Sequence, residues 1–314
     1  MDPKIELPTH WYTLPPPTPV ETAQETISTR PFYKRPRVIS IISAVVIALI
    51  IAIVVPLAVI LPKNSKAEER HTSIMLPLYI YPETNATWAP LYSALSARPD
   101  LKFTVIINPG SGPGSSQYPD ERYAASLERL ATYSNVEKLG YVHTLYATRN
   151  LSEVISDLNV YAGWVSGNQA FAMDGVFFDE SPHEFSQEAV DFMLSASQAV
   201  KDAQGFQGSK LVVRNPGVVP DSRFTDSNTD ISVLFEQTHD EYKLQESELS
   251  AMNHDRAHHC FMVHSLPTME QGEMQGFVDT LSRGAEYLFV TSNAGQYYEQ
   301  FGADWSQFVE TIAT

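Results

Sequence analysis

"MDGVFFDESP", residues 173–182, is the stretch from which the fold of this chain can be read. Its apolar run VFF, residues 176–178, lies between a glycine and a proline, which is typical of a short strand buried on both faces. Two carboxylates, Asp179 and Glu180, follow directly. Adjacent acids repel each other, and burial strengthens the repulsion. The strand therefore either ends at a solvent-exposed surface or places both acids in a functional site.

Similar apolar runs recur along the chain and predict eight short strands. They occupy residues 73–81, 102–108, 138–147, 173–182, 210–215, 231–238, 258–265 and 287–293. Helical patterns lie between most of them or follow the last, at residues 88–99, 120–134, 151–165, 186–203, 269–285 and 305–313. Strands alternating with helices over this length predict the α/β class and a (β/α)₈ TIM barrel. An open doubly wound sheet is the alternative, because periodicity does not show that a sheet closes.

The segment before these strands predicts a membrane anchor. Residues 38–61 contain no charged side chain, and 24 residues at about 1.5 Å each exceed a hydrocarbon core of roughly 30 Å. Four basic residues (Arg30, Lys34, Arg35 and Arg37) precede the segment and place the N-terminus in the cytoplasm. A cleaved signal peptide is the alternative, but its apolar core is normally about 7–15 residues.

This anchor predicts the organisation of the rest of the chain. Residues 1–37 are rich in proline and form a disordered cytoplasmic tail, and residues 62–72 form a polar stalk. Residues 73–314 are the barrel domain, outside the cytosol. We therefore expect a single-pass type II protein of the plasma membrane with an extracellular domain, in contact with the lipid bilayer through residues 38–61.

The composition and the glycosylation sequons limit the possible classes of function. The chain has 21 Lys and Arg against 37 Asp and Glu, a net charge of −16, which excludes nucleic acid as a partner. Its single cysteine, Cys260, allows no internal disulfide. The sequons at Asn85 and Asn150 predict N-glycosylation, which fits an exported domain.

Polar and aromatic residues follow the predicted strands, at the barrel face where catalytic side chains gather. They are Tyr79, Tyr81, Asn108, His143, Tyr146, Asp179, Glu180, Asn215, Glu236, Gln237, His264 and Asn293. Acids can transfer protons, amides and imidazoles can bind hydroxyl groups, and aromatic faces suit pyranose rings. Asp179, Glu180 and Glu236 are the candidate catalytic groups, because glycoside hydrolysis commonly needs two carboxyl groups. The alternative is that strand ends are polar because they meet water.

Other motifs predict no cofactor and no metal. The loop NPGSGPGSS, residues 108–116, lacks the Lys-Ser/Thr of a phosphate-binding P-loop. His254 and His258 have helical spacing, but no third ligand has suitable spacing for a metal ion. No G-x-S-x-G motif is present, so the sequence offers no support for a nucleophilic serine.

Five segments together resemble a known family. They are LPLYIYP (76–82), INPGSGPG (107–114), GYVHTLYATR (140–149), DGVFFDE (174–180) and LFEQ (234–237). In this order they resemble the spherulin-4-like fungal cell-surface proteins, glycoside hydrolase family 135, from about Ser73 to the end of the chain. The resemblance implies a barrel that makes endo-cleavages in α-1,4-linked N-acetylgalactosamine of galactosaminogalactan, a secreted exopolysaccharide of fungal biofilm matrix. Its acidic trio matches Asp179, Glu180 and Glu236.

The resemblance leaves individual roles open. Our hypothesis from sequence makes Glu180 the general acid/base, with Asp179, Glu236 or a substrate acetamido group as its partner. A non-catalytic glycan-binding module is the alternative function. A metal-dependent polysaccharide deacetylase is a third, although the sequence offers no Asp/His set for its metal. The net negative charge would also attract a partly deacetylated, cationic polymer.

Overall fold

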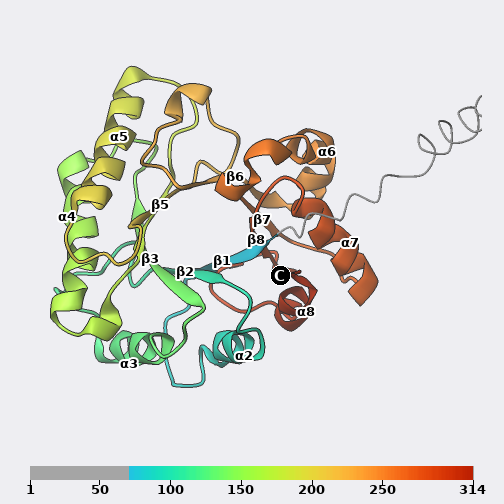
Figure 1. Cartoon of the computed structure of the whole chain (residues 1–314), viewed down its shortest axis with the longest axis horizontal. Helices are drawn as coiled ribbons and strands as arrows, with labels where there is room; N and C mark the ends of the chain where they lie inside the picture. Colours follow the sequence, from blue (N-terminus) through green and yellow to red (C-terminus); the bar gives the residue numbers. More distant parts are fainter. Residues whose placement is uncertain (1–70, 314) are drawn as a thin grey trace, which may run out of the picture. The chain divides into compact units, whose positions relative to one another are not determined.

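The computed structural model describes residues 71–313, apart from the side chains of Asn253 and His254, and shows a closed barrel of parallel strands (Figure 1). The strands are β1 (Ser73–Leu78), β2 (Phe103–Ile107), β3 (Val136–His143), β4 (Gly175–Asp179), β5 (Leu211–Arg214), β6 (Ile231–Thr238), β7 (His259–His264) and β8 (Tyr287–Val290). Each pairs with the next in sequence, and β8 pairs with β1. The predicted barrel is confirmed, and the open sheet is excluded.

Helices surround the strands on the outside of the ring (Figure 1). They are α2 (Ala89–Ala97), α3 (Glu121–Leu130), α4 (Leu151–Gly163), α5 (Gln187–Asp202), α6 (His239–Ser250), α7 (Gln271–Leu281) and α8 (Trp305–Thr311). Side-chain caps begin several of them: the Asp120 carboxylate accepts from two backbone N–H groups of α3, and the Ser186 hydroxyl accepts from Ala189 of α5. These local signals agree with the predicted helix starts.

One helix differs from the sequence prediction, and one connection agrees with it. Helix α6 was not predicted, because it buries only Tyr242 and Leu249 among its residues and so has no clear apolar stripe. Between β5 and β6, where the sequence predicted no helix, strand and α-helix do not alternate. There the chain makes only the 3-10 helix η4 (Ser222–Phe224), since residues 216–230 are rich in proline, aspartate and serine.

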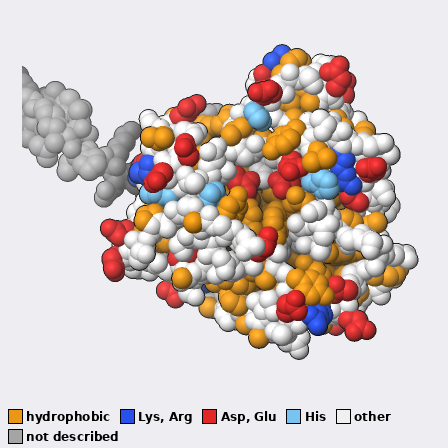
Figure 2. All heavy atoms as spheres, turned by 180° about the vertical axis from the view of Figure 1, so that it is seen from behind, with side chains coloured by type: hydrophobic (Ala, Val, Ile, Leu, Met, Phe, Trp, Pro, Cys, Tyr) orange, Lys and Arg blue, Asp and Glu red, His pale blue; other side chains and the backbone are white. Residues whose placement is uncertain are grey.

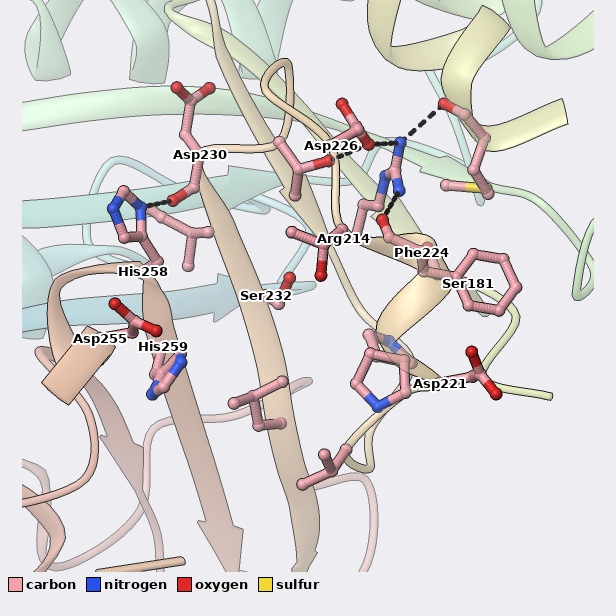
Figure 3. A pocket seen from close by; sticks show the side chains of 18 of the residues that line it. Ser181, Arg214, Asp221, Phe224, Asp226, Asp230, Ser232, Asp255, His258 and His259 are labelled. Atoms are coloured by element: carbon pink, nitrogen blue, oxygen red, sulfur yellow. Dashed lines mark hydrogen bonds and ion pairs between the residues drawn. The ribbon is translucent and has the colours of Figure 1, made fainter. Parts of the chain in front are cut away.

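The missing helix leaves a cavity of about 480 Å³ on the outer side of β5 and β6 (Figure 3). Arg214 extends from β5 into this region and is buried. Its guanidinium donates to the Phe224 carbonyl at 3.0 Å and pairs with the Asp226 carboxylate at 2.5 Å. It also donates to the Ser197 hydroxyl of α5. This cluster joins the loop before β6 to α5, and we assign it a structural role.

Gly175, at the start of β4, is required by the close approach of β5. A Cβ at this position would lie 1.9 Å from the Leu211 carbonyl oxygen. We expect Gly175→Ala to lower the free energy of unfolding by about 1–3 kcal/mol, because the two strands must separate to admit a methyl group. Chemical denaturation measures this.

Gly276→Ala in α7 is the matched control, since a Cβ there meets nothing within 4 Å. It should leave stability unchanged or raise it by up to about 1 kcal/mol. Equal effects of the two substitutions would contradict the steric explanation.

No helix within residues 71–313 combines the length and hydropathy needed to cross a bilayer. The predicted tail (1–37), membrane span (38–61) and most of the stalk (62–72) lie outside the described residues and stay predictions.

Candidate active site

The two open ends of the barrel differ in chemistry. In Figure 1 the helices α2 to α8 follow one another clockwise. Because βαβ connections are right-handed, this order means that the barrel is seen from the side where the strands begin. Figure 2 shows the opposite face, where the strands end. That face is hollowed at its centre, with acidic and hydrophobic side chains in the hollow. Barrel enzymes carry their catalytic groups at this end.

Two of the three predicted acids meet through one amide. Asp179 is the last residue of β4, Asn215 directly follows β5, and Glu236 lies on β6. The Asn215 side-chain nitrogen donates to Asp179 Oδ1 at 2.7 Å and to Glu236 Oε2 at 2.5 Å. Because both oxygens bond to the same nitrogen, the two carboxyl groups are close neighbours, as the paired carboxyl groups of glycosidases are. The predicted convergence of strands four, five and six is present.

A β-bulge in β6 brings Glu236 to the interior. Val233 pairs with Cys260 and Phe235 with Phe261, so Leu234 is an extra residue opposite β7. The bulge reverses the alternation of the strand. Phe235 then packs outward against Tyr242 of α6, and Glu236 lies on the inner face. Without the extra residue, Phe235 would point inward and Glu236 outward.

Tyrosines surround both carboxylates. Tyr141 Oη donates to Asp179 Oδ2 at 2.8 Å, and Tyr298 Oη donates to Glu236 Oε1 at 2.5 Å. Tyr79 contacts both of these rings edge-on, with centroids 5.3 and 5.5 Å away. Burial, followed by the charges of Asp179 and Glu236, raises the pKa of Tyr79 well above its ordinary value. The phenols therefore stay protonated and act as donors.

The two acids have different surroundings. Asp179 accepts from Tyr141, from Asn215 and from the backbone N–H of Glu180, an arrangement that suits an anion. Burial and then the neighbouring Asp179 charge raise the pKa of Glu236 to about 7, although its bonds from Tyr298 and Asn215 act in the opposite direction. With a pKa of about 7, Glu236 can carry a proton near neutral pH, as a general acid must.

Glu180 is placed differently. Strand β4 ends at Asp179, and Glu180 adopts a left-handed backbone with φ of 50°. Strand alternation therefore no longer fixes the direction of its side chain. Its Oε2 is buried and has no hydrogen-bond partner among the described residues. Its charge contributes to the raised pKa of Tyr141, after burial and the larger effect of Asp179. The third acid thus lies beside the bridged pair without joining it.

Backbone strain is concentrated at this face. Among the described residues other than glycine, those with positive φ in loops after strands are Ser111, Leu145, Tyr146, Ala147, Glu180, Ser265 and Gln296. Each left-handed residue costs about 1–2 kcal/mol. Such strain persists only where the surrounding structure fixes it, and it is typical of functional sites.

Three further predicted residues shape the rim. Asn108 Oδ1 accepts from the backbone of Gly112 and so folds its loop. The carbonyl of Ser111 in that loop lies 2.9 Å from His143 Nδ1. Tyr81 Oη donates to Asp120 at 3.1 Å and is partly exposed. These side chains are near the mouth, and their part in substrate binding stays a prediction.

The other predicted contacts are spread around the mouth. His264 stacks on Tyr297, with ring centroids 4.1 Å apart, and burial lowers its pKa. Tyr146 is exposed. Asn293 donates to the Gln300 carbonyl. Gln237 follows Glu236 within β6, so strand alternation directs it to the other face of the sheet. Its predicted role in binding stays untested.

Both predicted glycosylation residues are exposed. Asn85 lies in a turn before α2, and Asn150 caps α4 by accepting from the Ser152 N–H through Oδ1. Their glycosylation stays a prediction.

Three tyrosines of the site were missed from the sequence. Tyr141 precedes His143 by two residues and so shares its face of β3, a signal that strand alternation could have given. Tyr297 and Tyr298 lie in the loop between β8 and α8, where no periodicity marks them.

Comparison with known proteins identifies the family. The model of spherulation-specific family 4 matches residues 73–312. The chain belongs to this family. The resemblance stated from the sequence is confirmed.

Two known proteins are similar to this chain. The crystal structure of Aspergillus clavatus Sph3 in complex with GalNAc has a TM-score of 0.74 and 38% identity, covering 78% of this chain and 98% of that one. Spherulin-4 of Physarum polycephalum is 34% identical over 163 residues. That match covers 52% of this chain and only 44% of that protein, so the chain spans less than half of this relative's length.

Proposed function

We propose that this chain is an endo-acting glycoside hydrolase that cleaves α-1,4-linked N-acetylgalactosamine in galactosaminogalactan. The observation that carries the proposal is the Asp179–Asn215–Glu236 bridge at the barrel mouth, in which one amide joins two carboxyl groups and the pKa of Glu236 is raised to about 7. The similarity to Sph3, whose structure contains GalNAc, supports this class of sugar. Both observations also support the broader proposal that the barrel acts on glycans.

The geometry favours Glu236 over Glu180 as general acid. Its proton would pass to the glycosidic oxygen as the bond from that oxygen to the anomeric carbon breaks. An Asp179 oxygen would form the new bond to the anomeric carbon, giving a glycosyl ester. Water would then attack that carbon, its proton would return to Glu236, and the Asp179 carboxylate would leave. The close spacing of the two acids favours this retaining route over direct attack by water.

Tyr298→Phe is expected to move the alkaline limit of kcat/KM to higher pH. The Tyr298 hydrogen bond lowers the pKa of Glu236, so its loss raises that pKa further and keeps the acid protonated over a wider range. A pH profile of kcat/KM measures the shift. Tyr92→Phe, which removes a hydroxyl bonded to the Ser126 carbonyl at the outer face, is the control and should leave the profile unchanged. A limit that stays fixed or moves to lower pH in Tyr298→Phe would contradict this role for Glu236.

Product analysis tests the hydrolase against its alternative. The protein is incubated with galactosaminogalactan, and the products are examined by mass spectrometry. Shortened oligosaccharides are expected. An unchanged polymer that remains bound to the protein would instead support a non-catalytic glycan-binding module, and free acetate would indicate a deacetylase.

The location of the protein is part of the same proposal. A plasma-membrane anchor at residues 38–61 with the barrel outside would place the site beside an exopolysaccharide as it is exported, which suits a role in its biosynthesis and in biofilm matrix. External protease on intact cells should then degrade the barrel and spare residues 1–37. Protection of the barrel would overturn this location.

A further inference from the structure

The segment after β3 forms a left-handed turn built entirely from residues other than glycine. Leu145, Tyr146 and Ala147 have φ of 49°, 53° and 66°. The turn closes where the Thr148 N–H and hydroxyl both donate to the Leu145 carbonyl, at 3.0 and 2.6 Å. Glycine adopts this conformation readily, and these residues do not.

Hydrogen bonds fix the turn to the chain beside the acids. The Tyr146 N–H and the Thr144 hydroxyl both donate to the Glu180 carbonyl at 2.7 Å. On the other side, Arg149 donates to the His143 carbonyl and pairs with Asp157 at 2.7 Å. Glu180 directly follows Asp179, so the turn is held at a set position relative to the candidate nucleophile.

The turn exposes large side chains. Tyr146 is 57% exposed and Leu145 44%. A single exposed hydrophobic residue is normal at a protein surface. Here, however, the exposed Tyr146 ring lies on a strained backbone that hydrogen bonds hold in place. Because the ring is not buried, its burial does not offset the strain. Strain of this kind is maintained at ligand-binding sites.

A second aromatic surface lies across the mouth. His264, at the end of β7, stacks on Tyr297 with an interplanar angle of 5°. In the closed ring of eight strands, β3 and β7 lie on opposite sides. A glycan chain that reaches from Tyr146 to the His264–Tyr297 stack would therefore cross the mouth beside Asp179 and Glu236.

We propose that Tyr146 is a stacking platform for a sugar residue beyond the two that flank the cleaved bond, and that the left-handed turn exists to present it. This rests on the proposed function and adds to it an extended binding site. The ligand is a pyranose oligomer long enough to span the mouth. Sugar rings bind aromatic faces through their C–H groups, so the phenol ring, and not its hydroxyl, carries the interaction.

The test compares α-1,4-linked N-acetylgalactosamine oligomers of increasing length. Tyr146→Ala should raise KM for long oligomers by roughly three- to tenfold, with little change in kcat and no change for a disaccharide. Tyr146→Phe should behave as the unmodified protein. Leu145→Ala, in the same turn, is the matched control for disruption of the backbone and should also leave KM unchanged. A Tyr146→Ala protein with unchanged KM would overturn the platform, as would an equal loss in Tyr146→Phe or Leu145→Ala.

A binding measurement separates this inference from the hydrolase itself. Calorimetry with the same long oligomer on Glu236→Gln requires no turnover. If the unmodified protein cuts no oligomer, the proposed function fails. The platform still holds if adding Tyr146→Ala to Glu236→Gln weakens binding by a similar factor, and it is overturned if binding is unchanged.

Discussion

Replacing Glu236 with glutamine is expected to reduce kcat/KM on the polymer by about 10²–10⁴-fold. Glutamine preserves the size of the side chain and can still accept from Asn215, but it has no proton to give to the glycosidic oxygen. The loss of kcat/KM should be far smaller for an aryl glycoside, whose leaving group departs without protonation, because kcat/KM reports only the steps up to formation of the glycosyl ester. Steady-state kinetics on both substrates measure the difference.

Glu188→Gln, an exposed acid in the first turn of α5, is the matched control and should retain full activity. A Glu236→Gln enzyme that loses equal kcat/KM on both substrates would show that Glu236 does not act as the acid. The same comparison on Glu180→Gln tests the hypothesis made from the sequence, which gave that role to Glu180.

The stability of Glu236→Gln provides an independent check on the raised pKa of Glu236. The pKa of Glu236 is about 7 in the folded protein and near the ordinary value of about 4.5 when unfolded. The unfolded chain therefore loses this proton first, and the carboxyl reduces stability as pH rises from about 4.5 to about 7. Glutamine removes this dependence. Relative to the unmodified protein, the free energy of unfolding of the variant should be higher by on the order of 3 kcal/mol at most above pH 7, and should be unchanged near pH 4.

The strands could be predicted because each carries its own local signal. Residues 176–178 are buried in β4, and the two acids follow where the strand ends, so residues 173–182 predicted both the strand and the position of the acids at its end. The ring closes because the eight strands pair in sequence order, which is a tertiary property that periodicity does not contain. The number of strands, their alternation with helices and the length of the domain favoured the closed barrel over an open sheet, and the family resemblance implied the same fold.

The position of Glu236 could not be predicted from strand alternation. A simple strand through ISVLFEQT would place Phe235 on the same face as Val233, and Glu236 on the other. The extra residue at Leu234 reverses this order, and the sequence contains no glycine or proline there to mark a bulge. The loop that carries Tyr298 is likewise fixed by tertiary contacts: its phenol reaches Glu236 across the mouth. The site therefore depends on interactions that local patterns do not record.

Replacing Asp179 with asparagine is expected to reduce activity by about 10⁴-fold or more, on the polymer and on an aryl glycoside alike. Asparagine can still accept from Asn215 and from the Glu180 N–H, so the bridge can persist while the nucleophile is lost. Equal loss on both substrates separates this variant from Glu236→Gln, because a good leaving group does not replace an attacking carboxylate. Glu180→Asp, with a shortened neighbouring carboxylate, is the matched control and should lose less.

The covalent intermediate provides the decisive observation on Asp179. Glu236→Gln with an aryl glycoside should form the glycosyl ester quickly and hydrolyse it slowly, since the base for water is gone. Mass spectrometry of the quenched mixture should find the added sugar on the peptide that contains Asp179. An adduct on Glu180 would move the nucleophile by one residue. With no protein adduct under these conditions, the attacking group is the substrate acetamido group or a water molecule, and Asp179 is not the nucleophile.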